Sequence, residues 1–177
     1  MTTQLSLQVA RDQQWHREML IKEISSLRYL LRQGLAIRGH KEEEGNLYQL
    51  LKCRSEDVGT LSKWLNDGRY LSHEVVNELI EIMAHKVLRQ ILSEIREAEW
   101  FAIIGDETRD VSGAEQFALS IRWVDCDYTV YEDLIGLIEV DKTDAVTLTG
   151  VIKDALLRMM IPLNQCRGQA FDGASNM

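Results

Sequence analysis

Paired cysteines and long apolar runs are both missing from this chain of 177 residues. Its three cysteines, Cys53, Cys126 and Cys166, are an odd number at wide spacing. That pattern indicates buried free thiols in a reducing compartment and argues against a disulfide framework. No apolar run reaches membrane-spanning length, and the first residues contain no apolar signal-peptide core. We therefore expect a soluble protein that is not secreted and does not enter the membrane.

An excess of basic charge is missing too, and the net charge of −8 is unevenly spread. Residues 1–100 hold 14 Lys and Arg against 15 Asp and Glu, whereas residues 101–177 hold 6 against 13. A protein that binds nucleic acid mainly by electrostatic attraction presents a basic face. Any DNA affinity of this chain must therefore come from bound metal, from a local patch or from other parts of the protein.

The N-terminal residues, 1–99, have the apolar spacing of helices. Leucine and isoleucine recur at helical intervals over residues 13–33, a short helix is expected at about 47–54, and a further turn at about 58–65. The longest helix should begin after the N-cap Ser72 and end near residue 99. Its expected core-facing stripe consists of Val76, Leu79, Ile80, Met83, Val87, Ile91 and Ile95. We predict a helical region over residues 1–99.

From Trp100 onward the pattern changes to that of strands. A short apolar run predicts a buried strand over residues 100–105, and alternating apolar residues predict two more over 115–124 and 130–140. The connections between these strands are short, so an antiparallel meander is expected. A helix from Asp144 to about Met160 then leads past the only proline, Pro162, into a fourth strand over 164–171. This helix can return the chain so that the fourth strand lies parallel to the first.

Two aspartates follow predicted strands, Asp106 after the first and Asp172 after the fourth. If these strands are parallel neighbours, the two carboxylates meet at one edge of the sheet. Hard cations such as Mg²⁺ prefer oxygen ligands, and paired ions can promote phosphodiester cleavage. The alternative is that each aspartate is a turn or cap residue. Glu107 and Asp110 are weaker candidates, better explained by local hydrogen bonding and N-capping.

Several ordered motifs resemble those of hAT-superfamily transposase-derived proteins, in particular the branch with MYM-type zinc fingers. The motifs are Leu35 to His40, Gly45-Asn46-Leu47, Ile104 to Ser112, Glu115-Gln116, Ile121 to Asp125, and Cys166 to Met177. The resemblance implies an RNase H-like fold whose first half, residues 100–177, follows the helical region. It also implies a nuclear location, although a cytoplasmic one stays open.

Three acidic residues bind Mg²⁺ or Mn²⁺ for DNA cleavage and strand transfer in proteins of this type. Asp106 corresponds to the first and Asp172 to the second. The third, a glutamate far downstream, has no counterpart here, so the resemblance implies a metal-binding remnant without catalytic activity. DNA is then a partner of the full-length ancestor. The alternative is a domesticated, non-catalytic scaffold that binds protein partners.

Overall fold

The computed structural model describes residues 2–68, 70–109 and 111–171, with the side chains treated from residue 7 onward. The chain forms two compact units, Met1–Met83 and Ala84–Met177. We call them the helical unit and the sheet unit. The expected division after residue 99 stays a prediction. No helix in the described part of the chain is long and apolar enough to cross a membrane.

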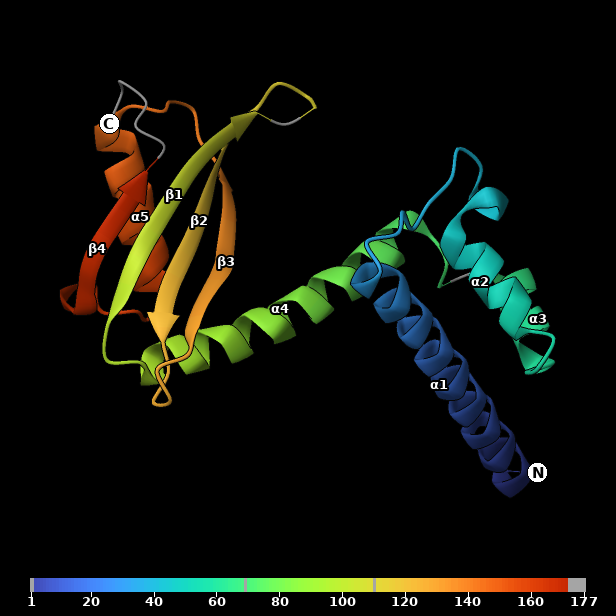
Figure 1. Ribbon diagram of the computed structural model, residues 1–177. Coiled ribbons are helices and arrows are strands. Elements are labelled where there is room, and N and C mark those ends of the chain that lie inside the picture. Colours follow the sequence, from blue (N-terminus) through green and yellow to red (C-terminus); the bar gives the residue numbers. More distant parts are fainter. Residues whose placement is uncertain (1, 69, 110, 172–177) are drawn as a thin grey trace. The chain divides into compact units, whose positions relative to one another are not determined.

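The helical unit contains α1 (Thr2–Arg32), α2 (Asn46–Arg54), α3 (Thr60–Asp67) and the beginning of α4 (His73–Glu97), with a short 3₁₀ turn at Glu42–Glu44. The predicted helices are all present (Figure 1). The first begins earlier than predicted, because the side chains of residues 7–14 are exposed and so carry no core-facing stripe.

The caps of these helices follow the sequence closely. Gly34 and Gly68 adopt left-handed backbone conformations, with φ of +63° and +64°, just after α1 and α3. The backbone N–H of Val75 donates to Ser72 Oγ over 3.4 Å, as expected for an N-cap. The prediction for Val87 was wrong, because its side chain is 58% exposed on α4.

The sheet unit holds four strands in the order β3-β2-β1-β4. β1 (Phe101–Arg109), β2 (Glu115–Val124) and β3 (Val130–Glu139) form the predicted antiparallel meander. After α5 (Ala145–Arg158), β4 (Cys166–Phe171) pairs with β1 in parallel. The α+β architecture expected from the sequence is therefore confirmed.

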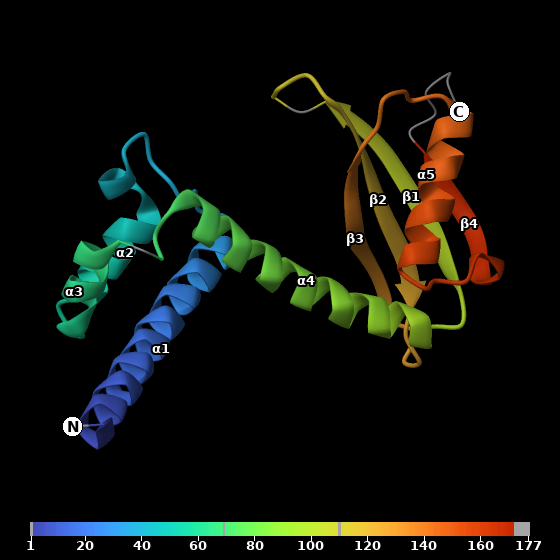
Figure 2. The same cartoon turned by 180° about the vertical axis from the view of Figure 1, so that it is seen from behind.

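One face of this sheet carries the core. Helix α5 lies across that face beside β4 and β1, in front of the sheet in Figure 2 and behind it in Figure 1. Its buried side chains, and those at the end of α4, join alternate residues of the strands in one apolar cluster. The cluster includes Ile95, Phe101, Ile103, Phe117, Leu119, Ile121, Leu148, Ile152 and Leu156.

The opposite face of the sheet carries small, polar and exposed side chains. Ala102 and Ser120 are half-buried there, and two leucines of β3, Leu134 and Leu137, are 53% and 62% exposed. The alternation of side chains along β1 assigns Asp106 to this same face, because its neighbours Gly105 and Glu107 point to the core side.

Candidate acidic site on the sheet

Asp106 lies inside β1 and not beyond its end, which corrects the expected strand boundary. The strand continues to Arg109, and Asp106 pairs with Ala118 of β2. The polar residues after Gly105 end the apolar run, yet their backbones continue to pair with β2. The Asp106 side chain is exposed, and no hydrogen bond or ion pair joins it to another residue of the described ranges. Its carboxylate is therefore available to a ligand.

Gly105, the residue before Asp106, is required by the packing on the core side of β1. A Cβ atom at this position would lie 2.6 Å from Cζ of Phe117 and 2.7 Å from Cε1 of Phe171. Phe117 is completely buried and cannot move aside at low cost. The missing side chain lets two aromatic rings from β2 and β4 pack over the centre of β1, and so keeps β4 close to Asp106.

Among the described residues, the parallel pairing of β1 and β4 can be followed as far as the partners Gly105 and Phe171. These residues directly precede Asp106 and Asp172 in the sequence. Asp172 itself lies outside the described residues, as does Asp110. The structure therefore positions the first predicted metal ligand and the strand that leads to the second.

Glu107 and Arg109 occupy the core side of β1 towards its end. Glu107 pairs with Phe117 in the ladder and is half-buried. It lies within a strand, so of the two roles expected for Glu107 and Asp110, N-capping does not apply to Glu107. Arg109 forms an ion pair with its cross-strand partner Glu115, and hydrogen bonds from the guanidinium to this carboxylate raise the pKa of Arg109. This pair fixes the start of β2 beside the end of β1.

Metal binding needs more oxygen donors than the described residues bring to Asp106. Within residues 2–68, 70–109 and 111–171, no group of three or more His, Cys, Asp or Glu side chains could hold a metal ion. Asp106 has the right chemistry as one hard oxygen donor for Mg²⁺ or Mn²⁺. It does not make a site alone, so we derive no reaction step through a metal.

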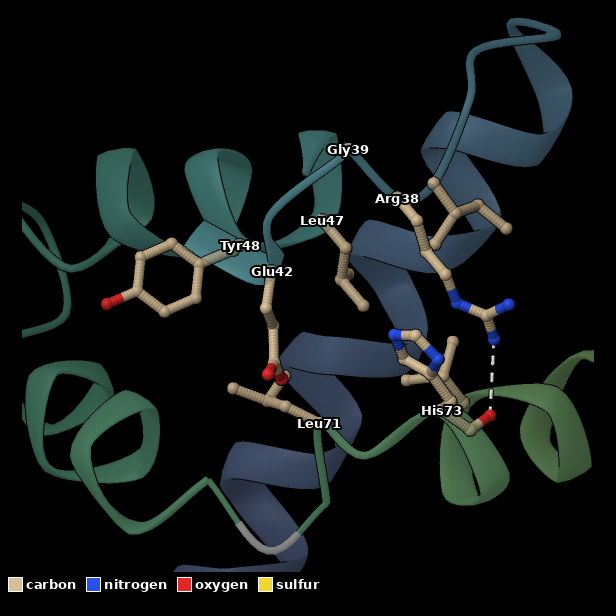
Figure 3. A pocket seen from close by; sticks show the side chains of 9 residues that line it. Arg38, Gly39, Glu42, Leu47, Tyr48, Leu71 and His73 are labelled. Carbon is tan, nitrogen blue, oxygen red and sulfur yellow. Dashed lines mark hydrogen bonds between the residues drawn. The ribbon is translucent and has the colours of Figure 1, made fainter. Parts of the chain in front are cut away.

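A second candidate site, a small pocket of about 40 Å³, lies in the helical unit beside the Arg38-Gly39-His40 motif. Figure 3 shows Leu47 and Leu71 within it, and Arg38, Glu42 and His73 around it. Arg38 Nη2 donates to the backbone carbonyl of His73 over 3.2 Å and also to Asn77 Oδ1. The arginine therefore ties the loop to the first turn of α4.

Gly39 of this motif and Gly45 of the Gly45-Asn46-Leu47 motif allow the two ends of the loop to approach closely. A Cβ atom on Gly39 would lie 2.9 Å from the backbone carbon of Glu44, and one on Gly45 would lie 3.1 Å from the backbone nitrogen of Gly39. Asn46 Nδ2 donates to the carbonyl of Ala36 over 2.7 Å. The pocket is too small for a substrate, and the motif is explained by folding alone.

A buried carboxyl group in the helical unit was missed from the sequence. Glu23 of α1 is completely buried, and Trp64 Nε1 of α3 donates to its Oε2 over 2.8 Å. Burial raises the pKa of Glu23 to about 7, and the hydrogen bond from Trp64 opposes this rise. The signal was present, because Glu23 stands three residues after Leu20 and four before Leu27, on the apolar stripe of its helix.

The expectation of buried cysteines was wrong. Cys53 and Cys126 are exposed, and Cys166 is half-buried. Cys126 belongs to the turn between β2 and β3, where few side chains can be covered. All three thiols are free, as predicted.

The chain is similar to a known protein family and to two named proteins. Residues 1–177 match the family described as DUF4371: ZMYM1/FAM200, RNase-like domain. The chain is also similar to the human protein named 52 kDa repressor of the inhibitor of the protein kinase, with 23% identity over 93% of the chain. The mouse protein of that name is 22% identical over 93% of the chain. The chain spans only 23% and 24% of the length of these relatives. No solved structure matches the chain significantly.

Proposed function

Because the chain belongs to the DUF4371 family of ZMYM1/FAM200 RNase-like domains, we propose that Asp106 and Asp172 are two acidic positions of an ancestral metal site for DNA cleavage. A transposase-derived, RNase-like domain agrees with both the family and the relatives. The finer assignment to hAT transposases, with nuclear location and DNA as the ancestral partner, is part of this proposal.

The parallel pairing of β1 with β4 supports this assignment most strongly. It makes partners of Gly105 and Phe171, each of which directly precedes one of the two aspartates. The exposed Asp106 carboxylate has no competing partner among the described residues. Two carboxylates brought together in this way would suit a hard divalent cation, which keeps several water ligands.

In this proposal the chain alone binds a metal weakly and does not cleave DNA. The resemblance implies a third acidic ligand that has no counterpart among these residues. A bound divalent cation would polarise a phosphoryl oxygen and lower the pKa of a bound water. Asp106 would contribute one oxygen ligand, and the pairing of β4 with β1 would bring the chain that leads to Asp172 near it.

The proposal is tested by titrating Mg²⁺ and Mn²⁺ into the chain while its thermal unfolding is followed. A ligand that binds only the folded state raises Tm, and we expect a rise of roughly 2–4 °C at saturation. Asp106→Asn and Asp172→Asn should each abolish most of the rise. Asp141→Asn, which removes the same charge from an exposed loop position, should keep it.

A uniform response of all four proteins would reject the metal site. A plasmid-nicking assay with Mn²⁺ provides the second readout, and we expect no cleavage by the wild-type chain. Cleavage that disappears in Asp106→Asn would overturn the proposed inactivity while retaining the site.

The alternative function, a non-catalytic scaffold for protein partners, is favoured by a different observation. Leu134 and Leu137 expose more than half of their surfaces on the side of the sheet opposite the core. The relatives are also named as repressors and not as nucleases. A scaffold predicts no metal response, so the same titration separates the two functions.

A further inference from the structure

The turn between β2 and β3 and the end of α4 enclose an aromatic groove at the start of β1. Figures 1 and 2 both show this turn beside the C-terminal end of α4. The groove measures about 490 Å³, and an adjoining hollow of about 400 Å³ shares four of its lining residues. We call the two together the hairpin groove.

Exposed aromatic and aliphatic side chains form the apolar walls of the hairpin groove. Trp100 is 43% exposed, Tyr131 is 40% exposed, and Tyr128 at the tip of the turn is 88% exposed. Tyr128 has a left-handed backbone with φ of +62°, a conformation that residues other than glycine rarely adopt. Exposed aromatic residues of this kind are enriched where proteins bind partners.

Carboxylates line the same groove and give it a strongly negative rim. Glu94, Glu97, Glu99 and Asp125 belong to its lining. The segment from Trp123 to Asp133 holds four acidic residues and no lysine or arginine. Asp125 accepts hydrogen bonds from the backbone of Thr129 and Asp127 and from the Tyr131 hydroxyl. These bonds, that from Thr129 foremost, lower the pKa of Asp125, so its charge persists at neutral pH.

The nearby cations are already engaged by the chain itself. Arg122 lies 3.9 Å from Glu132, and Arg96 donates to the backbone carbonyl of Met159 over 3.0 Å. Arg167 stacks with its guanidinium carbon 3.4 Å from the centre of the Trp100 ring. This cation–π contact occupies one face of the Trp100 ring, so Tyr128 is the most accessible aromatic surface of the groove. The carboxylates of the rim outnumber these cations.

We propose that the hairpin groove docks an arginine- or lysine-rich segment of a partner protein. The aromatic walls accept the aliphatic stems and the guanidinium planes of such side chains, and the rim carboxylates pair with their charges. The acidic rim repels nucleic acid phosphates, which excludes a DNA ligand here. The groove adjoins the beginning of β1, whereas Asp106 lies towards its other end, so this inference does not depend on the proposed metal site.

The test measures binding of a short synthetic peptide of alternating arginine and serine to the whole chain by isothermal titration calorimetry. A peptide of alternating glutamate and serine serves as the ligand control. We expect only the arginine peptide to bind, with an affinity that falls steadily as salt is added. Equal binding of the glutamate peptide, or no binding of the arginine peptide, would overturn the proposal.

Two double variants locate the binding. Glu97→Gln with Glu99→Gln should lower the affinity by roughly tenfold, because two rim charges are lost. Glu78→Gln with Glu81→Gln removes the same charge from exposed positions outside the groove and should change the affinity by less than about twofold. Equal losses in both pairs would mean non-specific attraction and would reject the groove.

A third variant separates docking from charge alone. Tyr128→Ala keeps the charge of the groove and removes an 88% exposed side chain, so folding should be unaffected. We expect about a threefold loss of affinity, with the secondary structure seen by circular dichroism unchanged. Sedimentation without peptide tests a second copy of the chain as the occupant. Dimers that the Glu97 and Glu99 variant dissociates would overturn the proposed partner.

Discussion

The helical unit buries a carboxyl group, whereas the sheet unit has an apolar interior. Glu23 and Ser26 are the buried polar side chains of the described residues, and both belong to α1. The fully buried side chains among the described residues of the sheet unit are all hydrophobic. Among its described acidic residues, Asp106, Glu94, Glu97 and Glu99 are exposed, whereas Asp125 and Glu107 are half-buried.

This difference separates two uses of charge. A carboxyl group inside a core couples stability to pH, because burial makes its ionised form unfavourable. A carboxylate at the surface is available to ligands and costs little stability. The functional chemistry of this chain is therefore expected on the sheet unit, and the strongest coupling between pH and stability on the helical unit.

The buried polar contacts of the helical unit extend beyond Glu23. Arg54 Nη1 of α2 donates to Ser26 Oγ over 2.6 Å, to Ser25 Oγ over 2.8 Å and to the backbone carbonyl of Lys22 over 3.0 Å. Glu23 Oε1 has no hydrogen-bond partner among the described residues. Burial therefore favours the neutral form of the Glu23 carboxyl group. The hydrogen bond from Trp64 to its other oxygen, Oε2, acts in the opposite direction.

Glu23→Gln should have the largest effect on the difference between the two units, because it removes the buried carboxyl group of the helical unit. The folded-state pKa of about 7 exceeds the ordinary value of 4.5, so the folded wild type binds more protons than the unfolded chain between these values. Its free energy of unfolding should fall as pH rises through this window, by about 2–3 kcal/mol in total. Glu23→Gln should remove this fall and be more stable than the wild type at about pH 8.

The measurement is denaturant unfolding across this pH range, with hydrogen exchange to locate the effect. Protection should change with pH in α1, α2 and α3 and remain constant in the strands. Glu18→Gln, at an exposed position of the same helix, is the matched control and should keep the wild-type pH dependence. A sheet unit that responds as strongly as the helical unit would refute the difference between them.

The second-largest effect is expected from Gly105→Ala, which should destabilise the sheet unit. The new methyl group would enter the space between Phe117 and Phe171, at 2.6 and 2.7 Å from their rings. Overpacking of this kind costs about 1–3 kcal/mol. Unfolding followed by circular dichroism should show the loss, and hydrogen exchange should place it in β1 and β4.

Gly136→Ala on β3 is the matched control for this substitution. Its Cβ atom would meet only Ile138, at an ordinary contact distance of 3.6 Å. We expect less than about half the destabilisation of Gly105→Ala. Similar losses for both variants would mean that general strand effects, and not the two aromatic rings, require the glycine.

The sequence predicts the order and direction of all four strands, because alternation and short connections leave one simple topology. It does not predict the full length of β1. Asp106 to Arg109 are polar, and hydrophobic patterning cannot detect backbone pairing between polar strand ends. Asp106 lies within a strand and not after it, and its role as a metal ligand stays a prediction. Asp172 lies outside the described residues, so its role stays a prediction.

The misses share a physical cause. Burial depends on what packs over a residue, and a local pattern does not contain that information. Glu23 lies on the apolar stripe of α1 and is covered by Trp64 from α3, whereas Cys126 is apolar in character yet stands in an exposed turn. A charged residue on a predicted apolar stripe, as Glu23 is on α1, is the one feature of the sequence that indicates a buried ionisable group in advance.

The smallest expected effect on stability concerns Asp144, a surface carboxylate at the start of α5 in the sheet unit. Asp144 caps α5, since its Oδ1 accepts from the backbone N–H of Thr147 and its Oδ2 from the Thr147 hydroxyl, each over 3.0 Å. These bonds, the backbone one first, lower the pKa of Asp144. Asp144→Ala should lower the free energy of unfolding at neutral pH, because the cap of α5 is lost.

Because the folded-state pKa of Asp144 is lowered, its contribution should be present above the unfolded value of 3.8 and disappear as pH falls through the folded value. The pH dependence is thus opposite in sign to that of Glu23 and lies in a more acidic range. Asp144→Asn keeps an oxygen acceptor for Thr147 and should lose less than the alanine variant. If both variants were equally destabilised at neutral pH, the charge and not the cap would hold the start of α5, and surface carboxylates of the sheet unit would matter to its folding more than the apolar core suggests.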